Sequence, residues 1–87
     1  MSLISEAGSG QRRRTAIHQA REAGRLWITR GVKPAGFTIE DHPTSGATMC
    51  VWTCVIPGND RLPDCRWRVE LTIGGKLISA NITETVK

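Results

Sequence analysis

The stretch that decides the fold covers eleven residues and reads Cys65-Arg66-Trp67-Arg68-Val69-Glu70-Leu71-Thr72-Ile73-Gly74-Gly75. Apolar and polar residues alternate up to Ile73, which is the period of a β-strand with one buried face. The two glycines that follow tolerate the positive φ angles of a two-residue type I′ hairpin turn. We therefore expect a hairpin formed by strands 65–73 and 76–84.

A two-residue turn also predicts the register of this hairpin. The expected pairs are Ile73 with Lys76, Leu71 with Ile78, Val69 with Ala80, and Trp67 with Ile82. In this register the apolar face of one strand continues onto the apolar face of the next. A slip of one residue would turn one of those faces toward solvent, so the pattern favours this pairing strongly.

Two further strands are expected before the hairpin, at residues 36–41 and 48–56, separated by the turn-forming segment 42–46. Matching the apolar faces of 48–56 and 65–73 in an antiparallel pair gives a second register. It sets Cys50 opposite Leu71, Trp52 opposite Val69, Cys54 opposite Trp67, and Ile56 opposite Cys65. The connection at 57–64 is rich in turn formers.

The N-terminal third of the chain predicts a helix. Ser9 is a suitable N-cap, and the segment 31–34 (Gly-Val-Lys-Pro) is typical of a helix end. A spacing of 100° per residue gathers one apolar face from Ile17, Ala20, Gly24, Trp27 and Ile28. Gly24 weakens the middle of the helix. The alternative to one helix ending at Arg30 is therefore a shorter helix followed by a strand that opens at 26–29.

Together these elements predict an α+β fold in which one N-terminal helix packs on a four-stranded antiparallel β-meander in two layers. Residues 1–8 are expected to form a flexible leader and residues 9–87 a single domain. With one Phe and no Tyr, we expect the three tryptophans to provide much of the aromatic packing. A chain of 87 residues is near the lower limit for a self-sufficient core, which leaves homo-oligomerisation open.

Composition narrows the classes of protein. The first residues lack the basic and apolar segments of a signal peptide, and no apolar run reaches the roughly 20 residues of a membrane span. We therefore expect a cytoplasmic protein that does not enter the membrane. Three cysteines, an odd number, argue against a disulfide framework. The formal net charge of +4 suits an acidic partner.

The clearest functional feature is a set of basic residues on the predicted helix. Three consecutive arginines, 12–14, fall in what would be its first turns, where the helix macrodipole disfavours cations. Stability alone does not account for them, so we interpret them as functional candidates. At helical spacing the series continues along one flank as Arg14, His18, Arg21 and Arg25. The alternative is a solvated basic face on which Glu22 offsets its neighbours.

Two more arginines lie on the predicted hairpin. Arg66 and Arg68 are on the outer face of strand 65–73, and they enlarge the basic surface only if they share an edge with the helix. The candidate partner-binding residues are thus Arg12, Arg13, Arg14, His18, Arg21, Arg25, Arg66 and Arg68.

The sequence gives little support for a metal site or a catalytic site. Zinc would require His42, Cys50, Cys54 and Cys65 to converge. Cys50 and Cys54, however, are about 13 Å apart along an extended strand. Nothing in the sequence fixes an activating histidine beside a cysteine, and no paired carboxylates stand out for acid–base chemistry. We predict no metal, no cofactor and no enzymatic activity.

Strand 48–56 is apolar on both faces, because Met49, Val51 and Val55 alternate with the residues expected to face inward. Either a loop partly covers its outer face, or the strand exposes an apolar patch that binds another protein or a second copy of the chain.

The leading hypothesis is a small non-catalytic binding protein whose basic helix docks on an acidic protein surface or on nucleic acid. In size and layout the chain resembles small phage-encoded host-takeover proteins, anti-CRISPR inhibitors among them. The resemblance covers architecture only, is carried by no motif, and implies an inhibitor that blocks a nucleic-acid-processing complex. The alternatives are a direct nucleic-acid-binding module and a structural subunit that self-assembles through strand 48–56.

Overall fold

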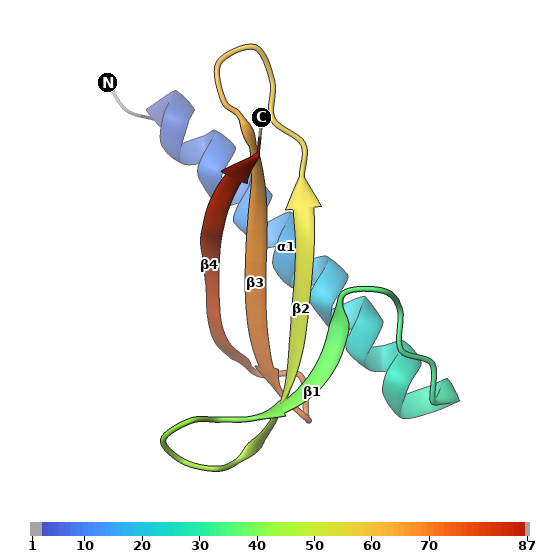
Figure 1. Cartoon of the computed structure of the whole chain (residues 1–87). Helices are drawn as coiled ribbons and strands as arrows, with labels where there is room; N and C mark the ends of the chain where they lie inside the picture. The colour runs from blue at the N-terminus through green and yellow to red at the C-terminus, as the bar shows by residue number, and fades with distance from the viewer. Residues whose placement is uncertain (1–2, 87) are drawn as a thin grey trace.

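The computed structural model describes residues 3–86, and for residues 3–9 it describes the backbone only. Helix α1 (Leu3–Arg30) precedes four strands: β1 (Phe37–Asp41), β2 (Thr48–Ile56), β3 (Asp64–Thr72) and β4 (Leu77–Val86). The strands form one antiparallel sheet in chain order, and α1 crosses one face of it diagonally (Figure 1). The predicted two-layer α+β fold is confirmed.

The central pair of strands has the predicted register. Each pair expected between β2 and β3 is present, namely Cys50 with Leu71, Trp52 with Val69, Cys54 with Trp67, and Ile56 with Cys65. On its other side β2 pairs with β1, with Phe37 opposite Trp52 and Ile39 opposite Cys50. These partners share the face that α1 covers, which is why apolar matching found the register.

The turn between β3 and β4 differs from the predicted type I′ turn. The Gly75 N–H donates to the Thr72 carbonyl at 2.9 Å, so Ile73 and Gly74 are the central residues of the turn. Within this turn only Gly75 has a positive φ, of 90°. This geometry is that of a three-residue hairpin loop closed by a left-handed glycine. The strands therefore end at Thr72 and restart at Leu77.

The longer loop changes the start of the hairpin register. Two predicted pairs are wrong, because Leu71 lies opposite Leu77 rather than Ile78, and Ile73 belongs to the turn. A register irregularity at Glu70/Leu71 then takes up the extra residue. Beyond it, the predicted pairs Val69 with Ala80 and Trp67 with Ile82 are confirmed.

Helix α1 is a single helix up to Arg30, so the alternative of a strand at 26–29 is wrong. Its end is the αL motif, in which the N–H of the C′ residue bonds to the C3 carbonyl. The Gly31 N–H donates to the Trp27 carbonyl at 2.9 Å, the Val32 N–H donates to the Leu26 carbonyl at 3.3 Å, and Gly31 has φ 66°. The predicted glycine C′ residue is thereby confirmed.

The start of α1 differs from the prediction, because the helix begins at Leu3 and Ser9 lies inside it rather than at its cap. Of the predicted flexible leader, residues 1 and 2 lie outside the described residues. No side chain up to Ser9 is described, and the leader stays a prediction.

The core lies between α1 and the sheet. From the helix it takes Ala16, Ile17, Ala20 and Ala23, which are at most 8% exposed. The short alanine side chains let the helix backbone approach the sheet closely, and the Trp67 side chain, 3% exposed, fills the space beneath. Ile28 was predicted on this face but is 59% exposed, because it lies at the margin of the apolar stripe near the end of α1.

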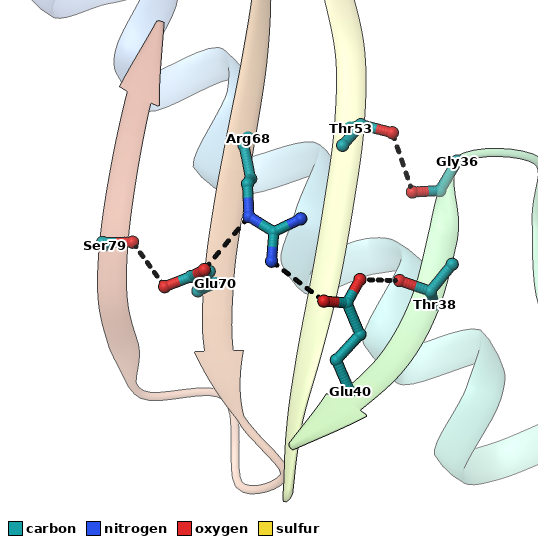
Figure 2. A network of polar contacts seen from close by, with 7 residues as sticks. All are labelled: Gly36, Thr38, Glu40, Thr53, Arg68, Glu70 and Ser79. Carbon is teal, nitrogen blue, oxygen red and sulfur yellow. Dashed lines mark hydrogen bonds and ion pairs between the residues drawn. The ribbon is translucent and has the colours of Figure 1, made fainter. Parts of the chain in front are cut away.

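The outer face of the sheet carries a chain of polar contacts that we call the outer network (Figure 2). Its members are Thr38, Glu40, Arg68, Glu70 and Ser79.

The outer network crosses β2 on the face that carries Val51, because Arg68 of β3 donates to Glu40 of β1 at 3.0 Å. Val51 and Met49 are at most 1% exposed there, whereas Val55 is 40% exposed. Of the two alternatives for β2, an exposed apolar patch is thus limited to its Val55 end, and self-assembly through this strand stays a prediction.

Within the described residues, α1 contains no stretch that is both long enough and apolar enough to cross a bilayer.

Candidate binding site

The positive charge of the protein is concentrated on α1. Residues 10–30 contain six arginines and one glutamate, a formal charge of +5, whereas the rest of the chain sums to −1. The arginines are those at positions 12, 13, 14, 21, 25 and 30, and the glutamate is Glu22. The electrostatic field is therefore strongest near α1, and it favours an acidic partner that binds at this helix rather than elsewhere on the molecule.

Four basic side chains share one flank of α1, which we call the basic flank. It consists of Arg14, His18, Arg21 and Arg25, all exposed and spaced so that they point to the same side. Among described residues the one ion pair here joins Arg25 to Glu22 at 3.6 Å, and both side chains are largely exposed. Exposed pairs of this kind exchange readily with water, so the flank offers its charge to a partner.

The other arginines of α1 have different positions. Arg13 points to the sheet, and its Nε donates to the Ala80 carbonyl of edge strand β4 at 3.4 Å. Arg12 is half-buried, and by helical spacing it shares the side opposite the basic flank with Arg30. The run of three arginines is therefore not one contact surface, since only Arg14 belongs to the basic flank.

The start of α1 also removes one argument for these arginines. Residues 12–14 lie beyond the first two turns of a helix that begins at Leu3. The macrodipole acts mainly on charges in the first and last turns. The expected electrostatic conflict is therefore wrong, and the case for function depends on the concentration of charge and on exposure.

The structure separates Arg66 and Arg68 from the basic flank. Both point from the sheet face opposite α1, and both are ion-paired (Figure 2 shows Arg68). Arg66 Nε lies 2.9 Å from Glu84, and Arg68 bonds Glu40 and Glu70 at 3.0 Å. Their charge is neutralised locally, so they do not extend the basic flank.

The outer network is electrostatically satisfied. Hydrogen bonds from Arg68 and then from Thr38 hold the pKa of the Glu40 carboxyl below its ordinary value. Glu70 accepts from Arg68 on one oxygen and from the Ser79 hydroxyl, at 2.8 Å, on the other. This arrangement stabilises the sheet and leaves no free cation to receive a partner.

A groove adjoins the basic flank, between α1 and the β3–β4 turn. We call it the α1–turn groove, and its volume is about 320 Å³. Its lining consists of Arg21, Gly24, Arg25, Ile28, Thr29, Cys50 and residues 71–75. Two arginines of the basic flank thus stand beside an apolar hollow, an arrangement that suits a ligand with both an acidic and an apolar part.

The aromatic residues offer little to nucleic-acid bases. Trp67 is 3% exposed, and Trp52 is half-buried beside the core. Trp27 is half-buried and is covered by the Lys33 ammonium group, 4.7 Å from the ring centroid. Binding of single strands commonly uses exposed aromatic platforms, and these three tryptophans are not such platforms.

The cysteines and histidines are not grouped. The three cysteines are free, and burial raises the pKa of the Cys50 and Cys54 thiols. His42 lies in the β1–β2 loop, where its Nδ1 accepts the backbone N–H of Thr44 and of Ser45 at 3.3 Å. In the described part of the chain, no set of three or more His, Cys, Asp or Glu side chains is arranged to hold a metal ion.

No family model, no curated protein and no solved structure matches this chain. Two features of the site escaped the sequence prediction. The concentration of charge on residues 10–30 could have been found by counting along the chain. The α1–turn groove could not, since its walls come from residues about fifty positions apart that only the turn geometry brings together.

Proposed function

We propose that this protein is a non-catalytic binding protein whose helix α1 docks on an acidic surface of a partner protein. The observation that carries the proposal is the distribution of charge. Residues 10–30 hold a formal charge of +5, and the exposed side chains of the basic flank present it on one side of the helix. Such a field steers an acidic partner toward α1 and raises the association rate.

A protein partner fits the surroundings of the basic flank better than nucleic acid does. The Ile28 side chain is 59% exposed and the Ile73 side chain is 42% exposed, and both line the groove beside Arg21 and Arg25. Apolar contacts beside charges are typical of protein interfaces. A phosphate backbone would need a longer basic track, and the paired arginines of β3 lie on the opposite face.

The mechanism is occlusion or scaffolding: charge guides the encounter, and apolar contacts beside the helix slow dissociation. One specific form is a blocking inhibitor of a nucleic-acid-processing complex, in which the basic helix covers an acidic surface of the complex.

Matched charge variants test this proposal. In the first, Arg14, Arg21 and Arg25 of the basic flank are changed to Ala. In the second, Lys33, Arg61 and Arg66 are changed to Ala, which removes the same charge from exposed places outside α1. The probes are a fluorescein-labelled peptide of alternating Glu and Ser and a labelled duplex DNA, followed by fluorescence anisotropy from low to physiological salt. Circular dichroism checks that both variants are folded.

We expect the acidic peptide to bind wild type and to bind the flank variant about tenfold more weakly, as three exposed pairs of about 0.5 kcal/mol each would give. The second variant should lose less than about threefold. Equal losses of peptide affinity in both variants would mean that only the net charge of the protein matters, and this result would overturn the proposal. DNA binding that is tighter than peptide binding and is lost in the flank variant would instead indicate a nucleic-acid-binding module.

A further inference from the structure

We infer that the α1–turn groove binds an aliphatic side chain of an acidic segment in the partner protein, while Arg21 and Arg25 bind the carboxylates beside it. This inference rests on the proposed function and names the chemistry of the partner at one place on α1. The groove is then the part of the site that recognises the amino-acid sequence of the partner segment, because a basic flank alone distinguishes partners by charge only.

The groove has an apolar interior and a basic rim. Leu71 and Cys50, at 2% and 3% exposed, form part of its lining from the sheet, and Ile28 and Ile73 line it as more exposed side chains. Its volume of about 320 Å³ is at the lower end of the range for ligand pockets, which is about 300–1,000 Å³. A groove of this size admits a side chain of a partner segment rather than a whole helix.

Gly24 keeps the groove open. It is buried in the middle of α1, yet a Cβ atom placed on it would meet no atom within 4 Å. Alanine would therefore fit there and would stabilise the helix by about 1 kcal/mol. A glycine that weakens a helix without any steric need breaks a local rule, and such places are candidates for function. Here the missing side chain leaves room in the groove for a group from a partner.

The rim offers two guanidinium groups to carboxylates. Arg21 Nε donates to the Gly75 carbonyl at 3.2 Å, which ties the side chain to the β3–β4 turn. No described residue forms an ion pair with Arg21, whose guanidinium carries five N–H donors in all. The Arg25 side chain is 70% exposed, and its contact with Glu22, at 3.6 Å, is long enough to be replaced by a closer carboxylate.

These features select one occupant. A phosphate or a run of acidic residues would use the rim and leave the apolar lining in water. An uncharged apolar segment would use the lining and leave the arginines without a partner. An extended segment with an aliphatic residue beside acidic ones uses both, and burial of a leucine side chain contributes about 1.5–3 kcal/mol when it is complete.

Three labelled peptides test the inference with the intact protein. They alternate Glu with Leu, Glu with Ser, and Lys with Leu, and fluorescence anisotropy at physiological salt gives their affinities. We expect the Glu-Leu peptide to bind about tenfold more tightly than the Glu-Ser peptide, which is about half the full contribution of one leucine. The Lys-Leu peptide should not bind. In ¹⁵N NMR spectra the Glu-Leu peptide should shift the amide signals of Gly74 and Gly75.

Variants then locate the leucine contact. Gly24→Leu fills the groove and should bring the affinity for Glu-Leu down to that for Glu-Ser, without changing the latter. Thr15→Leu places a leucine at an exposed position of α1 outside the groove and should leave both affinities unchanged. Ile28→Ser removes an exposed side chain of the groove, so it cannot disturb the core, and it should reduce the Glu-Leu affinity by about threefold.

The outcomes separate the two proposals. Equal binding of both acidic peptides, or a Gly24→Leu variant that keeps the advantage of leucine, would overturn the groove but leave the acidic-partner proposal standing. Failure of both acidic peptides to bind would overturn both. Binding of the Lys-Leu peptide as tightly as Glu-Leu would show that the rim arginines do not select acidic segments, and the groove inference would fall.

Discussion

The arginines of the central strand β3 are fixed by ion pairs, whereas those of the basic flank of α1 are largely free. In β3, Arg68 is fixed between Glu40 and Glu70 at 3.0 Å from each, while Trp67 next to it is buried under the helix. On the flank, Arg25 has one exposed contact at 3.6 Å. Strand register places partners around every side chain of β3, whereas a helix flank provides few. The arginines of β3 therefore stabilise the fold, and those of the flank are available for binding.

The largest effect is expected at the inner face of β3. Trp67→Ala should reduce the free energy of unfolding by about 3–5 kcal/mol, because it leaves a cavity between α1 and the sheet. That is a large part of the stability of a domain this small. Urea denaturation followed by circular dichroism measures it.

Trp67→Phe is the matched control for this change. The Trp67 indole N–H is buried without an acceptor among the described residues, so phenylalanine removes an unsatisfied donor along with some volume. We expect a loss of about 1 kcal/mol or less for this variant. A loss as large as that of Trp67→Ala would mean that the N–H has a partner, and the packing described for this face would be incomplete.

A smaller effect is expected on the outer face. Arg68→Met should cost about 1–2 kcal/mol, because Glu40 and Glu70 lose their shared cation. Arg66→Met removes a single exposed pair with Glu84 and should cost about 0.5 kcal/mol or less. Chemical denaturation of both variants measures the difference. Equal costs would show that the outer network adds nothing beyond an ordinary surface pair.

The sequence predicted the central strands well because their register depends on a pattern that repeats. Strand 65–73 is apolar on one face only, and the face of 48–56 that begins at Cys50 is apolar throughout. Matching these two faces gives the four expected pairs, and all four are present. The hairpin pairs near the turn were wrong because Gly74 and Gly75 are compatible with two loop lengths. A bulge then restored the register farther along, so the error stayed local.

The candidate site was harder to predict than the fold. The spacing of Arg14, His18, Arg21 and Arg25 predicted one shared flank, because a helix fixes the direction of its side chains. All four are exposed on one continuous helix, and their role in binding stays a prediction. Arg66 and Arg68 were joined to it only on the condition that they share an edge with the helix, which they do not. Two of their glutamate partners, Glu40 and Glu84, come from β1 and β4, and no local pattern reveals contacts between strands.

The smallest effect concerns the pH dependence of stability and compares two glutamates. Arg68 and Thr38 hold the pKa of the Glu40 carboxyl below its ordinary value of 4.5, so the folded state binds a proton there less readily than the unfolded chain. The stabilisation is fully present above pH 4.5 and is lost as the pH falls through the lowered pKa. Glu40→Gln should therefore be less stable than wild type at pH 7, by about 1 kcal/mol or less because the site is partly exposed, and the gap should close in acid.

Glu22→Gln on α1 is the control, because its pair with Arg25 is exposed and long; at pH 7 it should change stability by no more than about 0.3 kcal/mol. Thermal unfolding of the three proteins between about pH 3 and pH 7 measures both differences, a range that spans the ordinary pKa of a glutamate. A gap for Glu40→Gln that is unchanged in acid would mean that the carboxylate's charge does not matter to the outer network. A larger loss for Glu22→Gln than for Glu40→Gln would reverse the comparison, since the helix flank would then be the structural surface and the outer face the free one.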